Sequence, residues 1–179
     1  MRIEVEMKAW LKTEEEIETA REYLKKHGKF LKKSVKDDIY FAKPNAETFD
    51  FRIREVDGKY FVTEKKRKLV GKMEQNEELE FEVSDKEAFI ALTKNLGYVV
   101  FLRKTKKSEV YELEDRITAE ITTVGAANLQ PLGTFLEIEK LCEREEESGK
   151  ARKEIQKIFQ ELDLEKNIET RQYAVMLKP

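Results

Sequence analysis

The chain has 179 residues, of which 35 are Lys or Arg and 37 are Asp or Glu, so the net charge is only −2 although 40% of the residues are charged. Its length and its hydrophobic fraction of 40% are sufficient for a buried core, and we expect residues 1–179 to form a single domain. One His and one Cys exclude an internal disulfide and a Cys/His zinc cluster. Any chemistry must therefore use carboxylates, lysines, arginines and at most a bound metal.

The same composition limits the location and the partners of the protein. The amino terminus lacks the apolar segment of a signal peptide, and the longest apolar run, residues 98–102, is too short to span a bilayer. We therefore expect a cytoplasmic protein without a membrane partner, either a monomer or a homodimer. Balanced charge argues against a nucleic-acid partner, because backbone binders usually carry a basic excess. The abundance of Lys and Glu is typical of proteins from thermophiles.

The first elements are indicated by periodicity and capping residues. Apolar and charged side chains alternate over residues 2–12, which predicts a strand. Thr13 and Glu16 have the spacing of a capping box, and Gly28 stands where a C′ glycine ends a helix. We therefore expect a strand followed directly by a helix. Further strands are expected over residues 30–41, 48–56 and 60–69, with a hairpin turn at Asp57-Gly58.

The second half of the chain repeats this plan loosely. Glu80 and Glu82 each lie 76 residues after a glutamate of the first strand, since 80 − 4 = 76 and 82 − 6 = 76. Ser84 and Glu87 suggest a second capping box, and Gly97 a second helix end. The pattern predicts an internal duplication. It also predicts strands over residues 98–106, 109–115, 117–124 and 134–141, an amphipathic helix around 155–162 and a short one at 173–177.

Charged side chains share one face of each predicted strand. Glu4, Glu6 and Lys8 alternate with apolar residues in the first strand. The later strands carry similar pairs: Arg52 and Arg54, Thr63 and Lys65, Glu80 and Glu82, Lys104 and Lys106, and Glu137 and Glu139. Glu pairs occur on some strands and Arg or Lys pairs on others, so the faces are sorted by sign.

Two interpretations of these faces remain open at this point. In an ordinary antiparallel sheet, the charged faces point to solvent. If the sheet closes with its helices outside, the charged faces point inward, and the interior must then be wet, because burying so many charges in dry protein is prohibitively costly. Carboxylate pairs suit Mg²⁺ or Mn²⁺, and converging Arg and Lys suit phosphate oxygens. The second interpretation therefore specifies a metal-bound polyphosphate.

Several short motifs follow one another along nearly the whole chain. They are Glu4-x-Glu6-x-Lys8, Phe51-Arg52-Ile53-Arg54, Val62-Thr63-Glu64-Lys65, Glu78-Leu79-Glu80-Phe81-Glu82, Arg103-Lys104-Thr105-Lys106 with Tyr111, and Leu132-Gly133-Thr134-Phe135-Leu136-Glu137-Ile138-Glu139. The first resembles the ExExK signature of the CYTH family, the class IV adenylyl cyclases and thiamine triphosphatases. The others resemble further motifs of that family in the family's order.

The resemblance implies an α+β fold, an eight-stranded antiparallel β tunnel barrel with helices packed outside. It implies that a divalent metal, Mg²⁺ or Mn²⁺, is held by four carboxylates, namely Glu4, Glu6, Glu137 and Glu139. It implies that the triphosphate is held by six cations, namely Lys8, Arg52, Arg54, Lys65, Lys104 and Lys106. Lys8, Arg54 and Lys65 are expected to be catalytic among these, and Glu80 and Glu82 are expected to be further acidic lining.

The implied activity is a choice among three functions. A cyclase converts ATP to cyclic AMP and pyrophosphate, and the set of motifs favours this function. A triphosphatase hydrolyses thiamine triphosphate, a nucleoside triphosphate or inorganic tripolyphosphate, and two departures favour it: Lys106 stands where the family pattern has Arg, and Ala127 where it has Asp, with Asn128 beside it. The third function is a non-catalytic module that binds polyphosphate or nucleotide. Lys107 and Ser108 resemble a small insertion.

Overall fold

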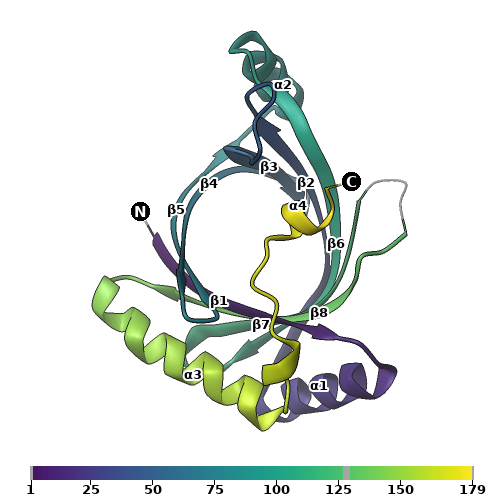
Figure 1. Ribbon diagram of the computed structural model, residues 1–179, viewed down its shortest axis with the longest axis vertical. Coiled ribbons are helices and arrows are strands. Elements are labelled where there is room, and N and C mark those ends of the chain that lie inside the picture. The colour runs from purple at the N-terminus through teal and green to yellow at the C-terminus, as the bar shows by residue number, and fades with distance from the viewer. Residues whose placement is uncertain (1, 127–129, 179) are drawn as a thin grey trace.

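Eight antiparallel strands close into a barrel in the computed structural model, counted over the residues that it describes, 2–126 and 130–178 (Figure 1). The strands lie in the order β1-β5-β4-β3-β2-β6-β7-β8 around the barrel. Their bounds are β1 Arg2–Leu11, β2 Gly28–Ala42, β3 Phe51–Val56, β4 Lys59–Val70, β5 Met73–Val83, β6 Val99–Leu113, β7 Ile117–Ala126 and β8 Gly133–Cys142. The predicted α+β class and tunnel barrel are confirmed.

The longer helices pack on the outer surface of this barrel, and a short helix near the carboxyl terminus lies at one of its ends (Figure 1). They are α1 Glu14–His27, α2 Lys86–Asn95, α3 Ser148–Glu161 and the short α4 Tyr173–Met176. The main core joins the outward-facing apolar residues of β1, β7 and β8 to α1 and α3, for example Val5 and Ile138 to Leu24 and Phe159. Because the apolar strand faces are used for this packing, the alternate side chains must point into the barrel. No helix of the described part is long and apolar enough to cross a membrane.

The first helix begins as predicted but ends for a different reason. Thr13 accepts a hydrogen bond from the Glu16 amide, and the Glu16 side chain accepts one from Thr13, which completes the capping box. Gly28 has an extended backbone (φ −152°) and is the first residue of β2. A Cβ on Gly28 would lie 2.6 Å from the carbonyl oxygen of Glu112. Glycine is needed here because β6 passes very close, and not because the helix ends in a left-handed turn.

The second helix corrects one expectation and confirms another. Its N-cap is Asp85, whose side chain accepts from the Ala88 amide, so the predicted capping box at Ser84 is wrong. Gly97 does end the helix in the left-handed region (φ +81°). Its apolar side chains are only partly buried, because Leu92 and Leu96 are exposed. The helix instead buries Ile90 and Thr93.

The sequence pattern gave one strand too many in the second half. Residues 98–106 and 109–115 were expected as two strands, but β6 runs through both without a break. Lys107 and Ser108 pair in register with Thr123 and Thr122 of β7, so they form no bulge there. Polar residues in the middle of a strand resemble a turn in sequence, although here they continue the alternation between the two faces of β6.

The barrel order supports the predicted internal duplication. Each strand of the first half has a counterpart four places later in the chain, so that β1 corresponds to β5 and β2 to β6. If every strand is replaced by its counterpart, the order around the barrel is the same but runs in the opposite direction. An approximate two-fold axis perpendicular to the barrel would have this effect. The two acidic strands, β1 and β5, are neighbours as a result, and so are β2 and β6.

Candidate active site

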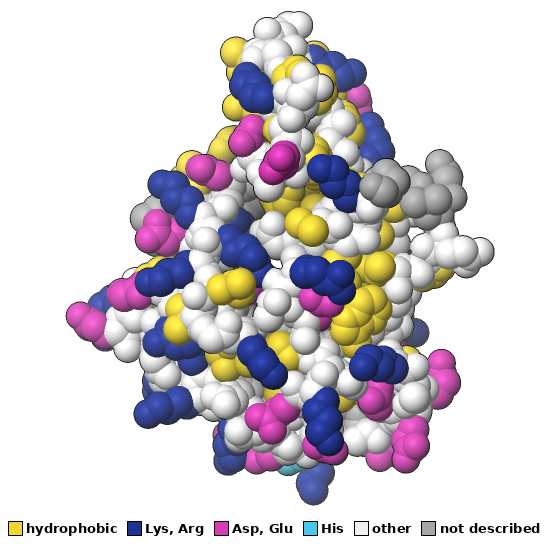
Figure 2. All heavy atoms as spheres, in the orientation of Figure 1, with side chains coloured by type: hydrophobic (Ala, Val, Ile, Leu, Met, Phe, Trp, Pro, Cys, Tyr) yellow, Lys and Arg dark blue, Asp and Glu magenta, His cyan; other side chains and the backbone are white. Residues whose placement is uncertain are grey.

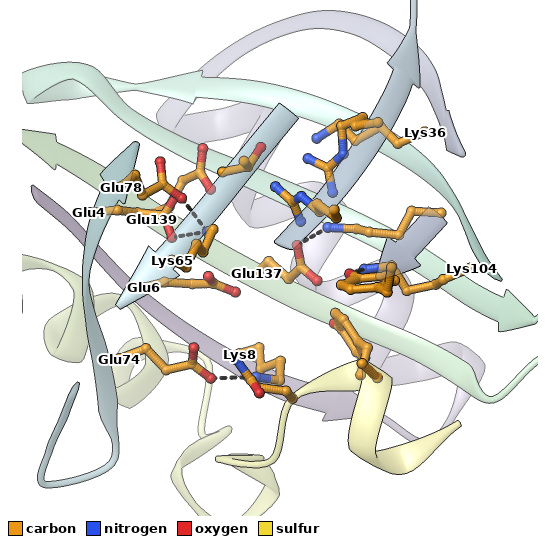
Figure 3. Close-up of a pocket in the computed structure, with 18 of the residues that line it drawn as sticks. Glu4, Glu6, Lys8, Lys36, Lys65, Glu74, Glu78, Lys104, Glu137 and Glu139 are labelled. Atoms are coloured by element: carbon orange, nitrogen blue, oxygen red, sulfur yellow. Dashed lines mark hydrogen bonds and ion pairs between the residues drawn. The ribbon is translucent and has the colours of Figure 1, made fainter. Parts of the chain in front are cut away.

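The side chains that point into the barrel are separated by charge into two walls. They surround a cavity of about 270 Å³. Glutamates from β1, β5 and β8 form the acidic wall, which consists of Glu4, Glu6, Glu78 and Glu139. Arginines and lysines from β2, β3 and β6 form the cationic wall, which consists of Lys36, Arg52, Arg54, Lys104 and Lys106. Figure 3 shows the labelled glutamates of the first group opposite Lys36 and Lys104 of the second. The charged faces therefore point inward, as the second interpretation of the sequence requires.

Two carboxylates of the acidic wall lie side by side without a cation. Glu6 of β1 and Glu139 of β8 are direct partners in the antiparallel register. Among the described residues, neither has a Lys or Arg within salt-bridge distance. Burial, and then the charge of Glu4, raises the pKa of Glu6 to about 8 and that of Glu139 to about 7. This pair is electrostatically strained and would be relieved by a bound cation.

Glu4, in contrast, is already paired. The Nζ atom of Lys65 lies 2.7 Å from Oε1 of Glu4 and 2.5 Å from Oε1 of Glu78, and Asn76 donates a hydrogen bond to Glu4 over 3.1 Å. Burial opposes ionisation of Glu4, but Lys65 outweighs it and lowers the pKa of Glu4 to about 2. Lys65 is thus the one member of the predicted triphosphate-binding set that contacts the acidic wall.

The cationic wall is held by buried carboxylates. Arg54 and Lys104 both contact Asp38 of β2. Lys106 is paired with Glu137, so this predicted metal ligand contacts the cationic wall. The wall thus has its own counter-charges.

The carboxyl-terminal segment crosses one end of the barrel, with α4 in front of the opening in Figure 1. Trp10 of β1 donates a hydrogen bond to Glu169 over 3.1 Å. The ring of Tyr173 in α4 packs against Phe135 and lies 5.3 Å from Nζ of both Lys8 and Lys104. The segment therefore adds the aromatic ring of Tyr173 to the lining of the cavity.

Most of the predicted site residues line this one cavity. They are Glu4, Glu6, Lys8, Arg52, Arg54, Lys65, Glu80, Lys104, Lys106, Glu137 and Glu139. Glu82, the other residue predicted as acidic lining, is not among them: it is exposed near the end of β5 and lies 3.5 Å from Lys59. This part of the prediction is wrong because β5 extends past the cavity. Ala127 and Asn128 lie outside the described residues.

Sequence reasoning missed several residues of the site. Lys36, Tyr40, Glu74, Phe49 and Tyr173 line the cavity, and Asp38 and Glu120 lie in contact with its cations. The alternation of Lys36, Asp38 and Tyr40 along β2 was a usable signal, but Asp37 between them is charged too and obscures it. Glu74 reaches the site through the pairing of β5 with β1, and Tyr173 through the carboxyl-terminal segment that crosses the end of the barrel (Figure 1). Neither of these contacts can be predicted from the neighbouring sequence.

The ligand atoms that the acidic wall offers are of the chemical type that a hard divalent cation binds. Glu4, Glu6 and Glu139 offer carboxylate oxygens only, which Mg²⁺ and Mn²⁺ prefer. No three His, Cys, Asp or Glu side chains of the described part form a closed metal cluster. Mg²⁺ usually keeps several waters and takes the rest of its ligands from one or two carboxylates and substrate phosphates. The wall therefore fits an open metal site that a phosphate would complete.

Known proteins resemble this chain in sequence and in fold. A Methanocaldococcus jannaschii protein named "Putative adenylate cyclase" is 36% identical over 173 residues, which is 92% of each chain. A Pyrococcus horikoshii protein of known structure has 30% identity and a TM-score of 0.78, over 98% of this chain and 99% of its own. A Hippeastrum protein described as a "putative adenylyl cyclase" with a dominant triphosphatase activity has 17% identity and a TM-score of 0.67, over 98% and 95%.

The family comparison agrees with the geometry. The sequence model of the CYTH domain matches residues 2–174, which includes all the strands of the barrel and the start of α4. The ordered motifs, the closed eight-stranded barrel and the charged interior all lie within this match. The chain therefore belongs to the CYTH domain family.

Proposed function

We propose that this protein is a divalent-metal-dependent enzyme that acts on a triphosphate inside the barrel and converts ATP to cyclic AMP and pyrophosphate. The observation that carries the proposal is the separation of charge around one cavity, with carboxylates on one wall and cations on the other. A metal–triphosphate complex presents the complementary pair of charges. The relative from Methanocaldococcus jannaschii supports the choice of cyclase by its name and its 36% identity.

Glu4, Glu6 and Glu139 would hold Mg²⁺ or Mn²⁺, with Glu137 as a further carboxylate beside Lys106. The bound ion would neutralise developing charge on the phosphate oxygens and help to orient them. Glu80 lies at the edge of the cavity, where it accepts a hydrogen bond from Thr63 over 3.0 Å. It adds negative charge to the acidic side of the cavity.

The cations would hold the triphosphate chain. Arg52, Arg54, Lys104 and Lys106 bind phosphate oxygens from one side, and Lys65 and Lys8 from the other. Phosphoryl transfer depends mostly on positioning and charge neutralisation, so these side chains provide most of what the reaction needs. In the cyclase reaction the ribose 3′-hydroxyl attacks the α-phosphorus, and pyrophosphate leaves. Lys8, Arg54 and Lys65 are the groups we assign to the reacting phosphates.

A triphosphatase is the second candidate, because the same cavity would serve it if water attacked the γ-phosphorus. Lys106 keeps a positive charge but lacks the two-pronged donor geometry of Arg. The Hippeastrum protein of similar fold, a putative adenylyl cyclase, is described as having a dominant triphosphatase activity. A difference in how the triphosphate lies in the cavity separates the two reactions.

One set of assays tests both candidates. The purified chain is incubated with Mg²⁺ or Mn²⁺ and, separately, with ATP, thiamine triphosphate and tripolyphosphate. Cyclic AMP with pyrophosphate identifies a cyclase, and orthophosphate identifies a hydrolase. Tight binding without any product would identify a polyphosphate- or nucleotide-binding module and would contradict the proposed enzyme.

A further inference from the structure

Asp38 is a buried carboxylate at the centre of the cationic wall. Its side chain, on β2, has no exposed surface. Nε of Arg54 donates to Oδ1 over 2.7 Å, and Nη2 of Arg54 donates to Oδ2 over 3.0 Å. Nζ of Lys104 lies 3.0 Å from Oδ2, and Nη1 of Arg52 lies 3.8 Å from the same atom. One carboxylate thus contacts three cations from two other strands.

The register explains why these groups meet. Asp38 is the direct partner of Arg54 on β3 and of Lys104 on β6, so it lies between them in one row across the sheet. Tyr40, the next inward residue of β2, accepts a hydrogen bond from Lys104 over 2.7 Å and donates one to Asp38 over 3.3 Å. The side chains of Arg54 and Lys104 are therefore fixed by both charge and geometry.

Asp38 lies behind the cations and not in front of them. Arg52, Arg54 and Lys104 line the central cavity, whereas Asp38 does not. A ligand in the cavity would therefore touch the guanidinium and ammonium groups but not the carboxylate. Burial opposes ionisation of Asp38, but Arg54 and Lys104 hold its pKa well below the usual range. The carboxylate is charged, so it reduces the mutual repulsion of the three cations.

We propose that Asp38 is a positioning residue, which aligns Arg52, Arg54 and Lys104 so that their donors face the triphosphate. The assignment rests on the proposed function, because it needs a triphosphate on the cationic wall. An arginine whose Nε and one Nη are fixed by a carboxylate keeps its other donors in a set direction. Misplacement of such donors by about 1 Å can reduce turnover about 100-fold.

The test is Asp38→Asn, which keeps the size of the side chain and removes its charge. Because the wall loses an anion, we expect the Kd for tripolyphosphate, measured by calorimetry without metal, to stay within about threefold of wild type or to tighten. We expect kcat to fall at least about 30-fold, because the donors lose their alignment. Arg54→Ala is the contrast, since it removes donors and should weaken tripolyphosphate binding at least about tenfold.

Asp37→Asn is the matched control. Asp37 is the preceding residue, exposed on the other face of β2, where it accepts a hydrogen bond from Thr105. We expect its kcat and Kd to match wild type. If kcat of Asp38→Asn equals that of Asp37→Asn, or if its loss disappears when activity is expressed per folded molecule, the positioning role is overturned.

A second pair of variants keeps the test valid if Asp38→Asn alone does not fold. Lys104→Met with Asp38→Asn removes one charge of each sign and restores the balance of the wall. We expect this double variant to fold and to have a lower kcat than Lys104→Met alone, because Arg52 and Arg54 are no longer held. Equal kcat values would overturn the assignment. If the wild-type chain neither binds nor turns over any triphosphate, the proposed function fails and the role of Asp38 with it.

Discussion

The ammonium group of Lys65 on β4 lies 2.7 Å from a carboxylate oxygen of Glu4 on β1, and β5 lies between these two strands. Lys65 belongs to the predicted triphosphate-binding set, and Glu4 to the predicted metal ligands. The Lys65 ammonium group therefore occupies the place where a metal ion would bind Glu4. The Glu4 carboxylate likewise occupies the place where a phosphate would bind Lys65. A metal ion bound to Glu4 must compete with Lys65, and the competition would free Lys65 to contact a phosphate.

This relationship predicts the effect of Lys65→Met on metal binding. Removing the ammonium group leaves Glu4 without its main counter-charge, and a hydrogen bond to a charged group contributes about 1.5–3 kcal/mol. We expect Mn²⁺ to bind about tenfold more tightly without triphosphate, measured by titration calorimetry or electron paramagnetic resonance. Lys66→Met is the control, since Lys66 is the exposed neighbour on the outer face of β4. Unchanged Mn²⁺ affinity in Lys65→Met would mean that Glu4 is not a metal ligand.

The acidic wall makes a second prediction about activity. Glu4→Gln combined with Glu139→Gln keeps the shape of the wall and removes two carboxylates, so we expect metal-dependent turnover to fall at least about 100-fold. Glu82→Gln is the matched control, because Glu82 is an exposed glutamate of the acidic strand β5 outside the cavity. Initial rates at saturating Mg²⁺ or Mn²⁺ provide the measurement. Full activity of the double variant would show that the metal site is elsewhere.

The raised pKa values of Glu6 and Glu139, about 8 and about 7, predict how stability depends on pH without metal. In the unfolded chain both groups ionise near their ordinary value of 4.5. Between about pH 5 and pH 8 the folded protein therefore binds more protons than the unfolded chain, and the free energy of unfolding falls as pH rises. Glu4, whose pKa is lowered to about 2, contributes no change in this window.

Thermal unfolding at pH 5.5 and 8, in the presence of a chelator, measures this slope. We expect Tm to be lower at the higher pH, and the combination of Glu6→Gln with Glu139→Gln to flatten the dependence, because neither amide titrates. A wild-type Tm that rises over this range would contradict the assigned shifts.

A fourth prediction concerns the close approach of β6 to Gly28. The Cβ of an alanine would lie 2.5 Å from a methyl group of Leu113 and 2.6 Å from the carbonyl oxygen of Glu112. The backbone oxygen cannot move aside as a side chain can, so we expect Gly28→Ala to destabilise the protein by about 1–3 kcal/mol, measured by urea unfolding. Gly125→Ala is the control, because among the described residues the nearest atom to its Cβ would be 3.8 Å away. Equal stability of the two variants would contradict the steric argument.

The sequence predicted the elements whose signals are local. The capping box at Thr13 and the alternation of Glu4, Glu6 and Lys8 both depend on neighbours within four residues, and both are confirmed. Local signals also misled: residues 98–106 and 109–115 were predicted as two strands, although pairing with β7 continues through Lys107 and Ser108 between them. Pairing between strands can override a local break because it is decided by residues far along the chain.

The site, like the fold, was predicted where the signals are local and not where distant strands decide. The sequence by itself determined which residue types alternate, and so it identified most members of the two walls, Arg52 and Arg54 among them, but not Glu78 or Lys36. It could not determine the direction of the charged faces, which follows from closure of the barrel between β1 and β8. Only the tertiary structure excluded Glu82 from the cavity, set Lys65 against Glu4, and placed Asp38 among three cations. These relationships depend on the register and on the ends of strands, which non-local hydrogen bonding fixes.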